Sequence, residues 1–164
     1  MSVLPILQWP DPRLNTRCDP VWSDDISALI AEMFETMYAA PGRGLAGPQV
    51  GAMLRVFVMD VGWKDGEKTP MACIDPEITW RSDETATGPE GCLSMPGVLA
   101  QVTRPAEIRL AYTDQNGALR EDHLTGFAAI CAQHEFDHLN GTMHFAHLPE
   151  TERDRLLADY GALS

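Results

Sequence analysis

The pentad His134-Glu135-Phe136-Asp137-His138 is the part of this sequence whose residue types and spacing most directly indicate chemistry. Residues four apart lie on the same face of a helix, so both imidazoles can bind one metal ion. Glu135 would then stand beside that ion. The HExxH pattern therefore predicts a metal centre with His134 and His138 as two of its ligands.

Such a centre needs a third ligand, and Cys92 is the first candidate. It follows a glycine in a polar, turn-rich segment, where a buried core cysteine is not expected. A bound metal would hold its thiol deprotonated. One thiolate and two imidazoles leave a fourth position open for water, which is typical of a catalytic rather than a structural site. The remaining cysteines are predicted to be small buried apolar residues: Cys18, Cys73 and Cys131.

His144 is an alternative third ligand. The segment from His134 to His144 fits HExxHxxGxxH, the pattern of metzincin proteases. Those enzymes also need a methionine turn after the motif, and here Met143 is the last methionine. This alternative predicts that the metal depends on His144 rather than on Cys92.

The segment from Gly42 to Gln49 is the third segment whose residues could take part in binding or catalysis. Its glycines and proline predict a tight loop, but its spacing matches neither a phosphate-binding loop nor a dinucleotide fingerprint. Loops that follow a helix often carry binding groups, and Gln49 offers an amide donor beside flexible backbone. A plain connection between a helix and a strand would have the same composition.

Helices and strands must position these three segments. The clearest helix lies within Ser23 to Ala40, where apolar residues recur at helical spacing and Ser23 or Asp24 can cap the start. A second helix runs from Gly126 to Leu139 and carries the pentad, with Asn140-Gly141 as its stop. Strands are predicted at 54–61, 71–75, 77–80, 107–113 and 119–124, with a hairpin turn at 114–117 and a short helix at 150–160.

This order of elements favours an α+β fold. We expect antiparallel or mixed sheets around the central helix that bears the HExxH pentad, with an N-terminal helix and a short C-terminal helix. A length of 164 residues predicts one domain, residues 1–164.

Charge and composition exclude several classes of protein. The 24 acidic residues against 12 basic ones give a net charge of −12, which argues against nucleic acid or an anionic membrane as the main partner. No apolar stretch approaches the roughly 20 residues that span a bilayer. Prolines interrupt the N-terminus, so it does not resemble a signal peptide. Four irregularly spaced cysteines indicate free thiols or a metal ligand. We therefore expect a cytoplasmic protein.

Three ordered motifs resemble those of the peptide deformylase family: GxGLAxxQ at 42–49, EGCLS at 90–94 and QHExxH at 133–138. The similarity also includes ILQWPDPRL, MFETMYAAPGRGLAGPQVG and the stretch from Cys92 to Pro105, and so covers nearly the whole chain. The resemblance implies an α+β fold in which sheets surround the HExxH helix. It also implies removal of the formyl group from the N-terminal formylmethionine of nascent polypeptides.

The resemblance assigns a role to each matching position. Cys92, His134 and His138 would bind the metal, and Glu135 would carry the proton. Gln49 and the backbone N–H of Leu93 would polarise the formyl oxygen. The backbone of Gly42, Arg43, Gly44 and Leu45 would pair with the substrate as an added strand. The positions near the methionine pocket or its support are Arg43, Glu90, Phe127 and Ile130.

The chemistry that such a site supports follows from the ion. A divalent metal lowers the pKa of bound water towards about 7, so a metal-bound hydroxide can attack the formyl carbon at neutral pH. Glu135 would take the proton of that water and deliver it to the leaving amine. A thiolate and two imidazoles suit both Fe²⁺ and Zn²⁺. From the resemblance we expect Fe²⁺ in the cell, with Zn²⁺ or Ni²⁺ as substitutes.

Four positions depart from the usual pattern of the family. Arg43 replaces an aliphatic residue, Gly47 an alanine, Leu99 an arginine and Ala146 an aspartate. None of these changes removes a ligand or Glu135. They bear on substrate affinity and rate, and they leave a weakly active or non-catalytic peptide-binding relative as an alternative. The charge of −12 further predicts transient contact with ribosomes rather than tight RNA binding.

Overall fold

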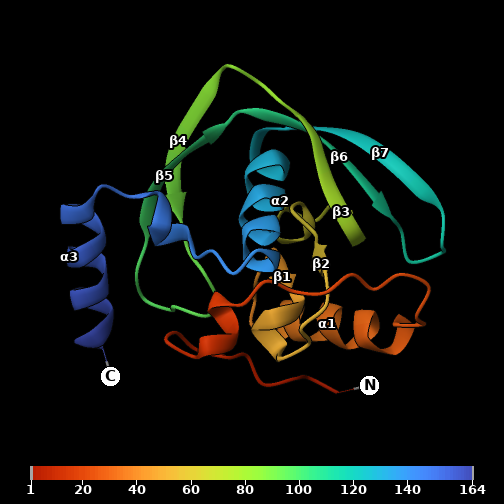
Figure 1. Ribbon diagram of the computed structural model, residues 1–164, viewed down its shortest axis with the longest axis horizontal. Coiled ribbons are helices and arrows are strands. Elements are labelled where there is room, and N and C mark those ends of the chain that lie inside the picture. Colours follow the sequence, from red (N-terminus) through yellow and green to blue (C-terminus); the bar gives the residue numbers. More distant parts are fainter. Residues whose placement is uncertain (1, 164) are drawn as a thin grey trace.

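The computed structural model describes residues 2–163, and residues 1 and 164 of the predicted unit lie outside that range. Helix α2 (Gly126–Leu139) lies at the centre, with a larger sheet on one side and the strand pair β4–β5 on the other (Figure 1). Helices α1 (Ser27–Ala39) and α3 (Glu150–Gly161) lie at the periphery. This arrangement confirms the α+β prediction.

The larger sheet is antiparallel and has the spatial order β1-β2-β3-β6-β7. Its strands are β1 (Gly44–Ala46), β2 (Val56–Met59), β3 (Met71–Arg81), β6 (Glu107–Thr113) and β7 (Leu119–Thr125). The second sheet pairs β4 (Thr85–Glu90) with β5 (Ala100–Pro105), also antiparallel. Strand β1 is an edge strand, and within residues 2–163 no strand pairs with the side of β1 that faces away from β2, so this side can pair with another chain.

Several strand predictions need correction. The bounds of β6 are as predicted, and the hairpin to β7 is confirmed. The two strands predicted at 71–75 and 77–80 are one strand, β3, whose register shifts between Ile74 and Glu77. Asp75 has a positive φ of 49° at this shift, and its carboxylate accepts hydrogen bonds from the backbone of Val21 and Trp22. Strands β1, β4 and β5 were not predicted.

The predicted cap of the first helix is also wrong. Helix α1 begins at Ser27, and the Asp25 carboxylate, rather than Ser23 or Asp24, accepts the hydrogen bond from the Ser27 backbone N–H. Helix α2 has the predicted bounds, and α3 is one residue longer than predicted. None of the helices within residues 2–163 combines the length and apolar character needed to cross a membrane.

Helix α2 is fixed in place by a core of small residues and by its C-terminal end. Ala129 and Ala132 are fully buried and let the helix pack close to the larger sheet. At the other end, the carbonyl of Leu139 accepts hydrogen bonds from the Cys18 backbone N–H at 2.9 Å and from Arg55 at 2.8 Å. These bonds satisfy a carbonyl that a helix end leaves unpaired. The histidines of α2 therefore stand on a rigid support.

Candidate active site

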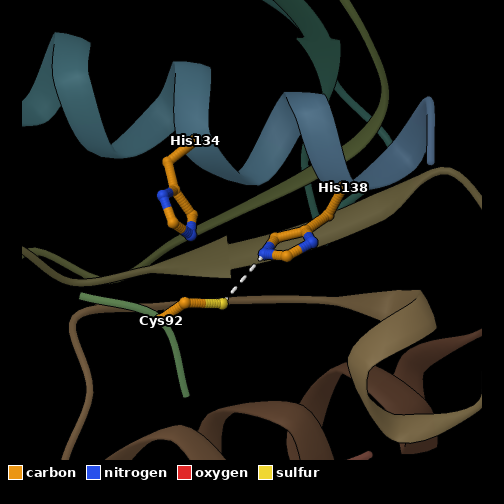
Figure 2. A group of neighbouring side chains, drawn as sticks. All are labelled: Cys92, His134 and His138. Carbon is orange, nitrogen blue, oxygen red and sulfur yellow. Dashed lines mark hydrogen bonds between the residues drawn. The ribbon is translucent and has the colours of Figure 1, made fainter. Parts of the chain in front are cut away.

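Helix α2 presents both histidines of the pentad to the same side. The rings of His134 and His138 point from the helix towards Cys92 (Figure 2), and their ring centroids are 5.0 Å apart. Both side chains are buried, at 8% and 1% exposure. The expectation that i and i+4 imidazoles share one face is confirmed.

Cys92 completes the group from a segment far away in the sequence. It lies in the connection between β4 and β5, and its Sγ is 3.4 Å from His138 Nε2. One ligand atom from each of Cys92, His134 and His138 lies within 4.8 Å of the others. Cys92 is also buried, in an apolar cluster with Met95 and Met143, although its polar neighbours in the sequence had indicated that it is not a core residue.

The donor set fits a divalent transition metal. His134 uses Nδ1 to bind Glu90 at 2.9 Å, which leaves its Nε2 for an ion. His138 directs Nε2 towards the sulfur, and its Nδ1 has no hydrogen-bond partner within the described range. With these three side chains as ligands, a fourth coordination position would stay open, as in catalytic sites.

A network of charged side chains supports His134 from behind. Arg104 binds both oxygens of Glu90, at 2.7 and 3.0 Å, and also binds Asp137 at 2.8 Å. Burial by itself raises the pKa of Glu90, but hydrogen bonds from His134 and Arg104 bring that pKa down to about 2. Glu90 is therefore ionised and fixes the ring of His134. Its contacts place it in the support of the metal centre.

Sequence reasoning missed two members of this network. Arg104 is 3% exposed on β5, and Asp137 accepts a second bond from His147 at 2.7 Å. Asp137 lies inside the pentad, next to His138, and this position was the signal in the sequence that could have identified it. Arg104 carries no local signal, because only the fold brings it between two acids.

Cys92, His134 and His138 are called the metal group below. Glu135 lies beside this group and is 5% exposed. Burial raises its pKa to about 7, so the carboxyl group can both accept and give up a proton near neutral pH. Its Oε1 has no hydrogen-bond partner in residues 2–163. A Cβ atom placed on Gly44 would lie 2.6 Å from its Oε2, so the backbone of β1 approaches the carboxylate closely.

Gln49 belongs to a 3₁₀ helix, η2 (Gly47–Val50), and its side-chain amide lies beside Cys92. Its Oε1 accepts a hydrogen bond from the Ala46 backbone N–H at 2.9 Å, which fixes the amide. Its Nε2 donates to Ser94 Oγ at 3.1 Å and lies 3.7 Å from Cys92 Sγ. The amide donors therefore face the metal group.

The loop around Gly47, a position where the family usually has alanine, is packed tightly. A Cβ atom at Gly47 would lie 2.6 Å from the Ala52 carbonyl oxygen and 2.8 Å from that of Leu54. Alanine would not fit here without a shift of the backbone.

One cavity of about 650 Å³ joins the metal group to the predicted substrate positions. Its wall includes Cys92, His134 and Glu135. Leu45 is different, because its side chain is fully buried in the core that α1 covers. The predicted substrate residues that do line the cavity are Gly42, Arg43, Gly44, Glu90, Leu93, Phe127 and Ile130.

The structure does not support His144 as the third ligand. Its ring lies 5.6 Å from that of His134, centroid to centroid, and is 1% exposed. The group that could hold a metal in the described residues contains Cys92 and the two histidines of the pentad, without His144. Neither ring nitrogen of His144 has a hydrogen-bond partner in that range.

Comparisons with known proteins agree with this geometry. The family model described as Polypeptide deformylase matches residues 3–154. The peptide deformylase of Afipia carboxidovorans is 41% identical over 162 residues, covering 98% of this chain and 95% of the relative. That of Cellvibrio japonicus is 44% identical, covering 95% and 92%.

Solved structures give the same result. The peptide deformylase of Ehrlichia chaffeensis in complex with actinonin superposes with a TM-score of 0.92 at 38% identity, covering 100% of this chain and 99% of that one. The Thermotoga maritima peptide deformylase gives 0.85 at 40% identity, covering 91% and 99%. Family model, relatives and structures therefore lead to one conclusion: the chain belongs to the peptide deformylase family.

Proposed function

We propose that this chain hydrolyses the formyl amide at the N-terminus of formylmethionyl peptides, with one divalent ion held by Cys92, His134 and His138. The observation that carries the proposal is the meeting of three ligand atoms within 4.8 Å of one another, beside the buried carboxylate of Glu135. A binding protein without catalysis has no need of a buried proton acceptor at this point.

The residues around the ion divide the reaction between them. The bound ion supplies Lewis acidity, which lowers the pKa of water and polarises a carbonyl. Glu135 takes the proton of the attacking water and then gives a proton to the leaving amine nitrogen. The Gln49 amide and the Leu93 backbone N–H stabilise the negative charge that grows on the formyl oxygen. Each such donor contributes about 10²–10³ in rate.

The cavity wall explains selection of the substrate. A formyl group carries only hydrogen on its carbonyl carbon, so it needs less space beside Glu135, which β1 approaches closely at Gly44, than a larger acyl group does. Phe127 and Ile130 offer an apolar surface for a methionine side chain. The free side of β1 can pair with the substrate backbone, which accepts varied sequences.

We expect the ion to be Fe²⁺ in the cell, with Zn²⁺ or Ni²⁺ able to replace it. The mixed thiolate and imidazole ligands suit all three ions. Metal analysis of protein purified without oxygen tests this expectation. The substrates are nascent chains, so we place the reaction in the cytoplasm with at most transient ribosome contact, since a net charge of −12 opposes tight RNA binding.

Formate release tests the proposed reaction. The protein loaded separately with Fe²⁺, Ni²⁺ and Zn²⁺ is incubated with formyl-Met-Ala-Ser and, as a control, with acetyl-Met-Ala-Ser. We expect release of formate from the first peptide and no acetate from the second. Absence of turnover in all three metal forms would contradict the proposal and favour a non-catalytic peptide-binding protein.

A pair of variants tests the ligand set. Cys92→Ser removes the thiolate, and we expect the purified protein to lose its metal, because two imidazoles alone bind less tightly. His144→Ala is the matched control, since His144 is buried beside His134 but lies outside the ligand group. Metal analysis after dialysis measures both. Loss of metal from His144→Ala with retention in Cys92→Ser would overturn the assignment.

A further inference from the structure

Arg43 stands in the wall of the catalytic cavity without an acidic partner. Its side chain lines the cavity together with Glu135 and His134, and no ion pair joins it to a carboxylate of residues 2–163. Its Nε is buried and has no hydrogen-bond partner in that range. This is unexpected in a chain where 24 acidic residues face 12 basic ones.

Neither of the two carboxylates in the cavity wall, Glu90 and Glu135, forms an ion pair with Arg43. Glu90 accepts two hydrogen bonds from Arg104 and one from His134. Glu135 is the buried proton carrier at the metal group and makes no ion pair with Arg43. No carboxylate of residues 2–163 therefore neutralises the charge of Arg43, and a buried donor without a partner costs free energy until something binds it.

Phe127 packs against the guanidinium of Arg43 in the cavity wall. The Cζ atom of Arg43 lies 5.3 Å from the centroid of the Phe127 ring, and this ring is half exposed. An arginine that stacks on an aromatic face is restrained while its planar N–H groups remain able to bind a carboxylate. The stacking therefore presents a fixed anion-binding group beside the substrate path.

Lys64 adds a second positive charge to the same wall. It also lines the cavity, is exposed, and has no carboxylate partner in the described residues. The Trp63 indole, over which the Lys64 ammonium lies at 5.8 Å, donates a hydrogen bond to the Gly42 carbonyl at 2.9 Å. The 63–64 turn is thus attached to the segment that carries Arg43, and the two cations act on one region.

The position of Arg43 fixes where a substrate charge would be recognised. Gly44 lies close to Glu135, beside which the proposed function places the reacting carbonyl of the substrate. Arg43 is the residue next to Gly44 in the chain. One residue of extended chain spans about 3.3 Å, so a peptide running beside β1 brings its first residues past Arg43.

We propose that Arg43, assisted by Lys64, makes this chain select formylated peptides with an aspartate or glutamate within two residues after the formylated one. The inference rests on the proposed function and adds a substrate class to it. The net charge of −12 repels an acidic peptide from the protein as a whole. Arg43 and Lys64 would offset this repulsion at the cavity and so allow the acidic peptide to bind.

The test compares peptides that differ only in one charge. Binding of formyl-Met-Glu-Ser and formyl-Met-Gln-Ser to the metal-loaded Glu135→Gln protein is measured by calorimetry, so that turnover is not required. We expect the glutamate peptide to bind about tenfold more tightly at low salt. The preference should decline as NaCl is raised to 0.5 M, because salt screens exposed charges.

Variants assign the preference to Arg43. In Arg43→Leu the ratio of the two affinities should fall to about one, whereas Arg43→Lys should keep part of it. Lys68→Met removes the same charge from outside the cavity wall, and the ratio should stay at its original value. Equal binding of both peptides by the parent protein, or binding of neither, would overturn the inference. Formate release from formyl-Met-Ala-Ser, which has no acidic residue, reports separately on the proposed function.

Discussion

At the scale of single residues, the proposed metal centre is supported by a carboxylate outside the proposed ligand set. Glu90 fixes the ring of His134 and is itself fixed by Arg104. Partners of this kind orient a ligand and raise its basicity, and their loss commonly costs 10- to 100-fold in metal affinity. Glu90 therefore has a measurable role that is separate from substrate contact.

We expect Glu90→Gln to weaken metal binding by about 10- to 100-fold, because the amide loses the charge that pairs with Arg104 and His134. Competition with a chelator measures the affinity. Glu121→Gln is the control, since Glu121 pairs with Arg109 at the surface with both side chains about half exposed. An unchanged metal affinity in Glu90→Gln would show that the network is not needed to hold the ligand.

Gly44→Ala tests how closely β1 must approach the proton carrier. The new Cβ would lie 2.6 Å from Glu135 Oε2 and 2.8 Å from Cys131 Sγ, so the carboxylate has to move. We expect at least about a 100-fold loss of kcat, since a small misplacement near the reacting atoms has that effect. Gly88→Ala, with nothing within 4 Å of its Cβ, should retain activity. Similar kinetics in both variants would contradict the close approach.

Residue chemistry predicted that Cys92, His134 and His138 form one group, whereas the network that supports this group could not be predicted. Two patterns can be recognised without knowledge of the fold: the spacing of His134 and His138, and a cysteine beside a glycine. Arg104 becomes informative only when β5 brings it between Glu90 and Asp137. The burial of Cys92 was missed for the same reason, because its apolar neighbours come from distant segments.

At the scale of elements, helix α2 was predictable and the strands nearest the site were not. Gly126 and the Asn140-Gly141 pair delimit an apolar periodic stretch, so its bounds follow from local signals. Strand β4 contains Gly88 and Pro89, residues that are depleted in strands, and it pairs only with β5. Strand β1 has three residues in a glycine-rich segment. Tertiary pairing rather than propensity makes these two segments strands.

Gly141→Ala tests how the N-terminal segment packs against the C-terminal end of α2. Gly141 has a φ of 76°, and an added Cβ would lie 2.7 Å from the carbonyl carbon of Asn15 and 2.9 Å from the backbone nitrogen of Thr16. We expect the free energy of unfolding in denaturant to fall by more than about 2 kcal/mol, because strain and a backbone clash add.

Gly66→Ala separates the two causes. Gly66 also has a positive φ, 88°, but nothing lies within 4 Å of its Cβ position. Strain alone should therefore cost about 1 kcal/mol in this variant. Equal losses in the two variants would mean that the N-terminal segment does not pack against the end of α2 as described.

At the scale of the whole molecule, an ion held by Cys92, His134 and His138 would link parts of the chain that are distant in sequence. Cys92 belongs to the core cluster that includes α3, and the two histidines come from the central helix. A ligand that binds only the folded state stabilises it by mass action. Removal of the metal should therefore lower the stability of the entire fold.

We expect chelation to lower the Tm by about 5–10 °C, on the basis of about 2.7 kcal/mol at a metal concentration 100 times Kd and a protein of this size. Restoring Zn²⁺ should restore the Tm, whereas Cys92→Ser should not respond to the ion. Differential scanning calorimetry measures both. An identical Tm with and without metal would indicate that the three side chains do not share one ion.

The most direct test of the account is formate release by the metal-loaded protein and by its Glu135→Gln variant, with metal content measured in both. We predict that the parent protein cleaves formyl-Met-Ala-Ser and that the variant, still holding one ion, is slower by about 10²–10⁴. Equal rates in the two proteins would contradict the assignment of Glu135 as the group that moves the proton.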